Sequence, residues 1–315
     1  MPYRGYVMKK KILVAVDGSA YSSNSIDYLI RLFREDKTIN LHLFSVVSET
    51  GSGQNWMYEV DPHRGHSTVT ERRRITAERY LQDALARLLR NGFNEEQVSF
   101  SAEITPTQIA TAIHHEANRG MYDSLVIGRR GIGKVGEMFF GSVSAFLVEK
   151  CHEVPLWIID GEITSSRFLL AVHGMPESLM AADHLGYIME NNPEAEALLY
   201  HSLILFRKEP EIAVEVFHKQ WGKEWCDQYL DPENYLFYAH AQVLQDNGVH
   251  KECITQLPMG RNLDASHDLI KHAKKNKCGT IIIGRRSRES AKGFLGGVSD
   301  RILSQAENLS LWLVG

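Results

Sequence analysis

Short apolar runs alternate with segments of helical periodicity along the chain. Ile12–Val16 is an apolar run rich in β-branched residues, which predicts a buried strand ending at Asp17. The apolar positions 26, 29, 30 and 33 then have the spacing of an amphipathic helix, which Ser19 or Ser22 can cap. Further strands are predicted at 41–47, 98–104, 125–127 and 156–159, and further helices around 81–89, 107–118 and 142–150. This alternation predicts a parallel sheet covered by helices on both faces.

The pattern occurs twice in the chain. The matching segments are KILVAVDG at 11–18 with RFLLAVHG at 167–174, LVIGRR at 125–130 with IIIGRR at 281–286, and PLWIID at 155–160 with SLWLVG at 310–315. The first two pairs are 156 positions apart and the third is 155 apart. Three matches in the same order, at nearly one spacing, predict a duplicated domain.

The expected fold class is therefore α/β, with two tandem doubly wound domains. Each is expected to be a five-stranded, mainly parallel sheet flanked by helices, with a boundary in the polar stretch 161–166 that gives domains at 1–163 and 164–315. The second copy has the longer insertion, at 208–248. Its Trp221 and Trp225 are expected to pack the insertion against the sheet, and a helix is predicted from 232 to 247.

Composition narrows the class of protein. The 315 residues are 43% hydrophobic and 23% charged, which argues against disorder, and the net charge of −4 disfavours a nucleic-acid-binding protein. No apolar run reaches the ~20 residues of a membrane-spanning helix, and the N-terminal segment lacks the features of a secretory signal. The four cysteines are widely spaced, with no C-x-x-C pair. We therefore expect reduced thiols and a cytoplasmic protein without a membrane partner.

The chemical signal lies in GRRGIGKVGEMFFGSVS, residues 128–144. Glycines allow phosphate to approach the backbone closely, and a helix that begins near Ser142 offers free N–H groups, so a phosphate site is predicted. A Walker-type loop is disfavoured because Val135 follows Lys134 where Ser or Thr would hold Mg²⁺. A lone G-x-G-x-x-G at 131–136 is weak evidence for a dinucleotide. A surface loop with tight turns is the remaining interpretation.

A fourth pattern, G-x(2)-G-x(9)-G-S from Gly128 to Ser142, fits without a gap. It resembles the ATP-binding motif of the universal stress protein family. Both halves share that family's order of strands, and KILVAVDGS resembles its first-strand motif, so the chain is most similar to the tandem two-domain type.

The resemblance implies ATP, with or without Mg²⁺, as the ligand of the N-terminal domain. Asp17 would lie against the adenosine, although a turn or a helix cap is the alternative role for this residue. The other residues implied are Val46 at the adenine, Ile127 and Gly128 as the floor, and Gly131, Gly141, Ser142, Val143 and Ser144 around the phosphates and ribose. It also implies a role in stress response, and the last strands of the two domains, Leu156–Ile159 and Leu311–Val314, are expected to pair within one chain. A homodimer is left open.

The second half departs from the motif. His173 stands at the position of Asp17, Ser287 replaces the second glycine, and Gly297 stands at the position of Ser142, whereas Ser299 matches Ser144. We expect a structural or regulatory second domain without ATP. The competing hypothesis is an anionic ligand drawn by the basic residues Arg285, Arg286 and Arg288.

Two alternatives to nucleotide-dependent regulation remain. One is an enzyme, a slow ATPase or an adenylyl transferase, for which Lys134 and Glu137 are the charged candidates inside the loop. The other is a scaffold that binds no nucleotide.

Overall fold

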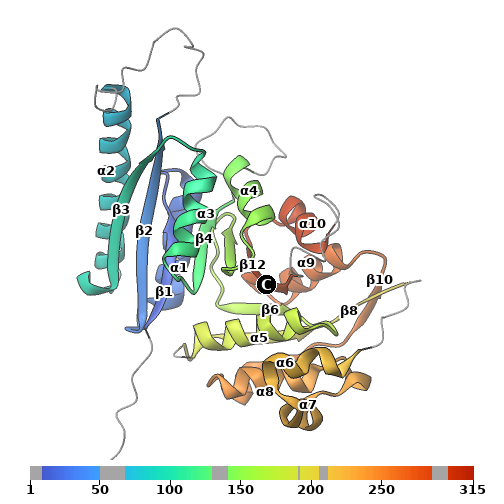
Figure 1. Cartoon of the computed structure of the whole chain (residues 1–315). Coiled ribbons are helices and arrows are strands. Elements are labelled where there is room, and N and C mark those ends of the chain that lie inside the picture. The colour runs from blue at the N-terminus through green and yellow to red at the C-terminus, as the bar shows by residue number, and fades with distance from the viewer. Residues whose placement is uncertain (1–8, 50–67, 130–140, 191, 206–211, 286–296) are drawn as a thin grey trace, which may run out of the picture. The chain divides into compact units, whose positions relative to one another are not determined.

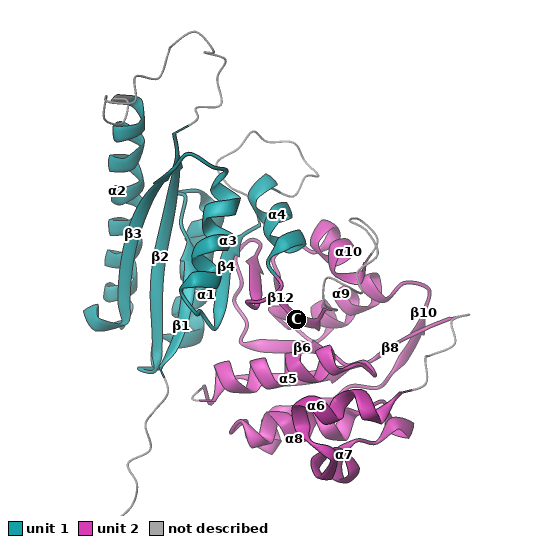
Figure 2. Ribbon diagram, in the orientation of Figure 1, with its two compact units in different colours: residues 1–136, 141–151 teal, residues 137–140, 152–315 magenta. Residues whose placement is uncertain are grey.

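The computed structural model describes residues 9–49, 68–129, 141–190, 192–205, 212–285 and 297–315 (Figure 1). The chain divides into two compact units (Figure 2). Unit 1 comprises residues 1–136 and 141–151, and unit 2 comprises residues 137–140 and 152–315. The division at 163/164 concerns the sequence repeat and stays a prediction.

Unit 1 contains a parallel sheet with the strand order β3-β2-β1-β4 (Figure 1). Its strands are β1 (Lys10–Ala15), β2 (Ile39–Ser48), β3 (Val98–Thr105) and β4 (Ser124–Gly128). In β1, Ile12, Leu13 and Val14 are fully buried, and β4 is buried along most of its length. A central parallel strand covered on both faces must be apolar on both, so the β-branched run at 12–16 forms the strand that it predicted.

Helices cover both faces of this sheet. They are α1 (Ala20–Phe33), α2 (Thr68–Arg90), α3 (Ile109–Arg119) and α4 (Ser142–Lys150), with a 3₁₀ turn, η1 (Glu95–Gln97), before β3. Helix α1 begins after Ser19, whose hydroxyl accepts a hydrogen bond from the backbone N–H of Ser22 at 3.1 Å. Ile26, Leu29 and Phe33 form its buried face, as their spacing predicted.

Unit 2 contains a sheet with the strand order β5-β12-β11-β6-β7-β9. The strands are β5 (Leu156–Ile159), β6 (Arg167–Ala171), β7 (Glu196–Tyr200), β9 (Ile254–Gln256), β11 (Thr280–Gly284) and β12 (Ser310–Val314). All neighbours pair in parallel except β5 and β12, which are antiparallel. The first half of the sequence supplies β1 to β5 and the second half supplies β6, β7, β9, β11 and β12, which is five strands for each half as predicted, and β5 lies in unit 2.

The pairing of β5 with β12 confirms the expectation that the two last strands meet within one chain. Trp157 is the register partner of Trp312, and their rings stack at 3.8 Å with an interplanar angle of 2°. Both side chains are fully buried, and the Trp157 indole N–H donates to Nε2 of His184 at 3.1 Å. Because each strand covers the edge of the other, two apolar edges are removed from water.

The helices of unit 2 follow the same order, with added elements in the insertion (Figure 2). They are α5 (Pro176–Met189), α6 (His218–Trp221), α7 (Lys223–Tyr229), α8 (Phe237–Asp246), α9 (Ala265–Lys275) and α10 (Val298–Gln305), with 3₁₀ turns η2 (Val214–Phe217), η3 (Pro232–Asn234) and η4 (Lys251–Cys253). A two-stranded parallel sheet joins β8 (Ser202–Ile204) to β10 (Gly260–Asn262).

The helix predicted from 232 to 247 was wrong in its first part. Asp231 caps only the 3₁₀ turn η3, and Tyr235 and Leu236 then adopt left-handed backbone conformations with φ of +53° and +61°. The α-helix α8 begins at Phe237. Leu236 is fully buried, so the gain from burying it offsets a conformation that costs an L-residue about 1–2 kcal/mol.

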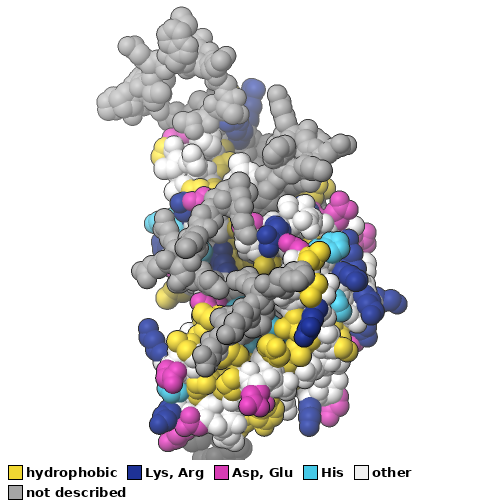
Figure 3. Space-filling model, turned by 90° about the vertical axis from the view of Figure 1, so that its right-hand side faces the viewer, with side chains coloured by type: hydrophobic (Ala, Val, Ile, Leu, Met, Phe, Trp, Pro, Cys, Tyr) yellow, Lys and Arg dark blue, Asp and Glu magenta, His cyan; other side chains and the backbone are white. Residues whose placement is uncertain are grey.

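The aromatic residues of the insertion pack mainly on one another. Trp221 lies 6.2 Å from Trp225, and Trp225 lies 5.1 Å from Tyr229, measured between ring centroids. Helix α8 carries the insertion's contact with α5 and β7, so the expected packing role is met by α8 more than by the two tryptophans. Exposed hydrophobic side chains also occur beside β8 and β10, and Figure 3 shows hydrophobic side chains gathered on the lower part of the face it displays.

Two expectations about the whole chain can be compared with the structure. The four cysteines all lie in the described parts of the chain, where none is joined to another by a disulfide, and their reduced state stays a prediction. Within the described ranges, none of the helices combines the length and the apolar character needed to cross a bilayer.

Candidate functional site

The carboxyl ends of β1, β2 and β4 bring several of the predicted residues to one edge of the unit 1 sheet. The β1–β2 register pairs Ala15 with Phe44, and its continuation by two residues places Asp17 level with Val46. The backbone N–H of Val16 donates to the Phe44 carbonyl at 2.9 Å, which maintains that register beyond the strand. In a doubly wound sheet, ligands bind outside this edge.

Asp17 is half-buried at the entry to α1. One carboxylate oxygen, Oδ1, accepts the backbone N–H of Ser19 at 2.9 Å. Asp17 thus holds the turn before α1, the alternative role weighed for it, and its carboxylate has a second oxygen with which to receive a ligand hydroxyl. Gly18 has a φ of +76°, and a β-carbon there would overlap the ring of Tyr80 from α2. Glycine is therefore required directly after the acid.

The end of β4 is packed tightly against the first turn of α1. A β-carbon at Gly128 would lie 2.8 Å from Cβ and 2.9 Å from the carbonyl carbon of Tyr21. The Gly128 carbonyl accepts the hydroxyl of Ser144 at 3.0 Å, which ties the first turn of α4 to the end of β4. The glycine is thus needed for close approach of two elements.

The N-terminus of α4 is the group on this edge best suited to an anion. Gly141 is the N-cap residue, and no side chain of the described residues caps the helix. The backbone N–H groups of the first turn and the positive end of the helix dipole are therefore presented to a ligand. Ser142 is exposed and Val143 is half-buried, whereas the buried Ser144 hydroxyl binds the Gly128 carbonyl.

Eight of the nine predicted residues lie in the described ranges, and Gly131 lies outside them, as do Lys134 and Glu137. Asp17, Val46 and Gly128 lie at strand ends where a ligand can reach them, but Ile127 is only 2% exposed and Ser144 only 3%. These two buried residues therefore pack beneath the carboxyl edge of the sheet and stabilise it. Nucleotide binding by this set stays a prediction.

The matching edge of unit 2 has different chemistry. His173 replaces Asp17, and its Nε2 lies 3.4 Å from the Gly284 carbonyl oxygen. A β-carbon at Gly174 would lie 2.6 Å from the Ile212 side chain. The insertion therefore covers Gly174, whereas Tyr80 covers its counterpart Gly18 in unit 1. Ser202, which corresponds to Val46 by the repeat, donates to the buried Asp268 carboxylate at 2.6 Å. Ser287, Arg286 and Arg288 lie outside the described residues.

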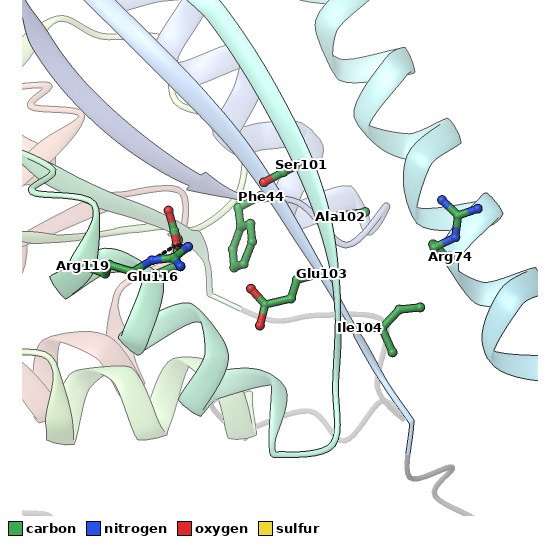
Figure 4. A pocket seen from close by; sticks show the side chains of 8 residues that line it. All are labelled: Phe44, Arg74, Ser101, Ala102, Glu103, Ile104, Glu116 and Arg119. Carbon is green, nitrogen blue, oxygen red and sulfur yellow. Dashed lines mark hydrogen bonds and ion pairs between the residues drawn. The ribbon is translucent and has the colours of Figure 1, made fainter. Parts of the chain in front are cut away.

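A cavity of about 470 Å³ lies elsewhere in unit 1, along β3 (Figure 4). Figure 4 shows Phe44, Ser101 and Glu103 on the α3 side of β3, and Ala102 and Ile104 on the α2 side toward Arg74. The remaining lining residues are Glu116 and Arg119 of α3. None of these residues belongs to the predicted nucleotide set.

Charged groups of α3 form a network beside this cavity. The Glu116 carboxylate accepts hydrogen bonds from the Tyr122 hydroxyl at 2.9 Å and from Arg119. Burial of Glu116 opposes its ionisation, but these two hydrogen bonds and the nearby positive charge of Arg119 together favour it, and the pKa of Glu116 lies below its usual value. Burial and the bond to Glu116 raise the pKa of Tyr122. The cavity wall therefore carries an ionised carboxylate and a guanidinium.

Sequence reasoning missed one cluster next to this cavity. His42 of β2 contacts the Ser99 hydroxyl through Nδ1 at 2.8 Å and the Ser101 hydroxyl through Nε2 at 2.9 Å. The sequence did carry a signal, because H-x-F at 42–44 and S-x-S at 99–101 place polar residues on alternate positions of two predicted strands. Among the described residues, no group of three or more His, Cys, Asp or Glu side chains is arranged to hold a metal ion.

Comparisons with known proteins agree with this fold. Residues 8–160 match the model of the universal stress protein family. The chain is similar in structure to a universal stress protein from Archaeoglobus fulgidus DSM 4304, with a TM-score of 0.64 and 14% identity, over 98% of this chain and 97% of that one. It is also similar to a functionally unknown protein from Pseudomonas aeruginosa PAO1, with a TM-score of 0.54 and 12% identity, over 98% and 93% of the two chains. No curated protein sequence gives a significant match.

The first half of the protein therefore forms a doubly wound α/β domain. That half, residues 8–160, belongs to the universal stress protein family. The similarity to the archaeal protein covers 98% of the chain and therefore includes the second half. At 14% identity this similarity concerns the fold and says nothing of the function.

Proposed function

We propose that unit 1 binds ATP at the carboxyl edge of its sheet and that the protein acts as a cytoplasmic regulator in stress response through nucleotide-dependent conformation or interactions. The observation that carries this proposal is the junction of β4 with α4. The Ser144 hydroxyl holds the uncapped N-terminus of α4 against the Gly128 carbonyl, on the edge where Asp17 and Val46 also lie. A carboxylate that can bind a ribose hydroxyl and a row of backbone N–H groups that can bind phosphate therefore lie at the same edge of the sheet.

The described residues fit such a ligand by their chemistry. Asp17 would accept a hydroxyl, Val46 would contact the base, and the first turn of α4 would receive phosphate. Mg²⁺, if bound, would be held mainly by the phosphates of the nucleotide and by water. A slow ATPase or adenylyl transferase is the competing hypothesis, and its charged candidates Lys134 and Glu137 lie outside the described residues.

Isothermal titration of the purified chain with ATP tests the proposal. We expect one ATP per chain, and Asp17→Ala should weaken binding by about 10- to 150-fold, the equivalent of one hydrogen bond to a charged group at about 1.5–3 kcal/mol. Asp17→Asn replaces the carboxylate with an amide whose oxygen can still accept the Ser19 N–H, so this variant separates loss of charge from loss of the turn. The matched control is Asp83→Ala, on the exposed face of α2.

Three results would contradict the proposal. They are no binding by the wild-type chain at millimolar ATP, equal affinity in Asp17→Ala and the wild type, and equal losses in Asp17→Ala and Asp83→Ala. Binding of two ATP molecules per chain would contradict the prediction that only the first half binds ATP.

A further inference from the structure

The cluster of His42, Ser99 and Ser101 has the parts of a nucleophilic site. Parallel pairing of β2 with β3 makes Ser99 the register partner of His42, and Ser101 lies two residues further along the same face. The imidazole bridges both hydroxyls, at 2.8 Å through Nδ1 and at 2.9 Å through Nε2. A neutral imidazole donates a hydrogen bond through one nitrogen and accepts one through the other. One serine hydroxyl therefore accepts a hydrogen bond from His42, and the other donates one to it.

The cavity distinguishes the two serines. Ser101 lines the cavity, and neither Ser99 nor His42 is among its lining residues. With Nδ1–H donating to Ser99, the lone pair of Nε2 accepts the hydroxyl proton of Ser101. The result is a hydroxyl facing open space, a base behind it, and a third group that orients the base.

Backbone geometry supplies a donor beside Ser101. The Glu49 N–H donates to the Thr105 carbonyl at 2.9 Å, and Ser48 is the register partner of Thr105. In a parallel ladder this directs the backbone groups of odd-numbered β3 residues toward β2 and those of even-numbered residues away from it. The N–H of Ala102, which follows the serine and also lines the cavity, therefore faces away from β2. An N–H on this open side of the strand is able to donate to an oxygen of a bound ester.

We propose that unit 1 carries an acyl-transfer site in this cavity, with Ser101 as the nucleophile, His42 as the general base and Ser99 as a positioning residue, acting on small carboxylic esters. Ser101 Oγ attacks the ester carbonyl carbon while its proton passes to Nε2 of His42. The C–O bond to the alcohol then breaks, and the alkoxide leaves with that proton. Water, deprotonated by His42, next attacks the acyl-serine, releasing the carboxylic acid and restoring the Ser101 hydroxyl.

The size and lining of the cavity limit the substrate. About 470 Å³ holds a small molecule. Phe44 offers an apolar wall for a short acyl chain, and Arg119, whose side chain is 68% exposed, offers a cation for a polar or anionic alcohol portion. Esters of short carboxylic acids fit both features.

The surroundings of His42 keep its imidazole unprotonated at pH 7, so that it can accept a proton. Burial lowers its pKa below 6.5, the nearby Glu116 carboxylate opposes that effect, and Lys11 adds to it. The Tyr122 ring lies 6.1 Å away, and its hydroxyl is bound to Glu116. Acylation should therefore increase with pH up to the pKa of His42, with a midpoint below 6.5, and remain constant above it.

The test is acylation of the full chain by p-nitrophenyl acetate, followed by p-nitrophenol release, intact mass and peptide mapping, without nucleotide. We expect one acetyl group on Ser101 and none in Ser101→Ala. His42→Gln should slow acylation by about 10²- to 10⁴-fold, the usual contribution of a general base. Ser99→Ala should move the midpoint of the pH profile to lower pH, because the hydroxyl that accepts Nδ1–H is lost, and a merely structural role would leave that midpoint unchanged. The control is Ser304→Ala, whose native hydroxyl donates to the Arg301 carbonyl.

The proposal is overturned if Ser101→Ala is acetylated as fast as the wild type, if His42→Gln retains the wild-type rate, or if the acetyl group maps to another residue. Circular dichroism of each variant confirms that it is folded. Because no nucleotide is present, failure of ATP binding leaves this result unaffected, and failure of acylation leaves the proposed nucleotide site untouched.

Discussion

Replacing Gly128 by alanine tests how the close contact between β4 and α1 supports the proposed nucleotide site. The new β-carbon would lie 2.8 Å from Cβ and 2.9 Å from the carbonyl carbon of Tyr21, so the two elements must separate by about 0.6 Å to reach a normal contact of 3.4 Å. The nearest atoms lie on or next to the backbone of α1, where no flexible side-chain end can turn aside. Overpacking of this kind costs about 1–3 kcal/mol.

The same separation would disturb the ligand edge. The Gly128 carbonyl holds Ser144 and hence the first turn of α4, so displacing it moves the N–H groups proposed for phosphate. If the full 1–3 kcal/mol appears in binding, the dissociation constant for ATP rises by about 5- to 150-fold. Urea unfolding followed by circular dichroism measures the first effect, and isothermal titration under native conditions measures the second.

Gly284 is the matched control, because the repeat places it at the same point of unit 2. A β-carbon there would overlap the Glu177 carbonyl group, so Gly284→Ala should also destabilise the protein. Its affinity for ATP should stay within about twofold of the wild type, since the proposed site lies in unit 1. The reasoning is refuted if Gly128→Ala unfolds at the wild-type urea concentration, or if the two variants lose ATP affinity equally.

Three further outcomes follow from single residues. Ser144→Ala should lower the free energy of unfolding by about 0.5–1.5 kcal/mol in urea titrations, because the hydrogen bond from the buried Ser144 to the part-buried Gly128 carbonyl is lost; an unchanged value would contradict this role. Burial lowers the pKa of His184 to about 3, so the unfolded chain takes up a proton below pH 6.5 that the folded chain does not, and stability falls as pH decreases. Between pH 7.5 and 5, His184→Gln should therefore lose about 2 kcal/mol less than the wild type, and parallel pH curves would show that burial of this ring is not the cause. Met121 has a φ of +49° and is 86% exposed, so Met121→Gly should raise the free energy of unfolding by about 0.5–1 kcal/mol in urea titrations, and a lower value than the wild type would argue against backbone strain there.

Much of the candidate nucleotide site could be predicted from the sequence, because its residues follow directly after strands. Asp17 ends the first buried run, Gly128 ends the fourth, and Ser144 stands in the first turn of the helix that follows the loop. Each position is set by a local change from strand to turn to helix. The contacts that support them were not predictable in this way, since Tyr80 reaches Gly18 from a helix some sixty residues later.

The sequence by itself determined the alternation of strands and helices, the duplication, and the residues at the strand ends, because burial on both faces of a parallel strand demands an apolar run. The tertiary structure decided which distant segments meet. It paired β5 with β12 in antiparallel fashion, interrupted the predicted helix at Tyr235 and Leu236, and brought His42 to Ser99 and Ser101. Hydrophobic periodicity reports on neighbours along the chain, whereas these contacts depend on strand order and register, which exist only once the sheet has formed.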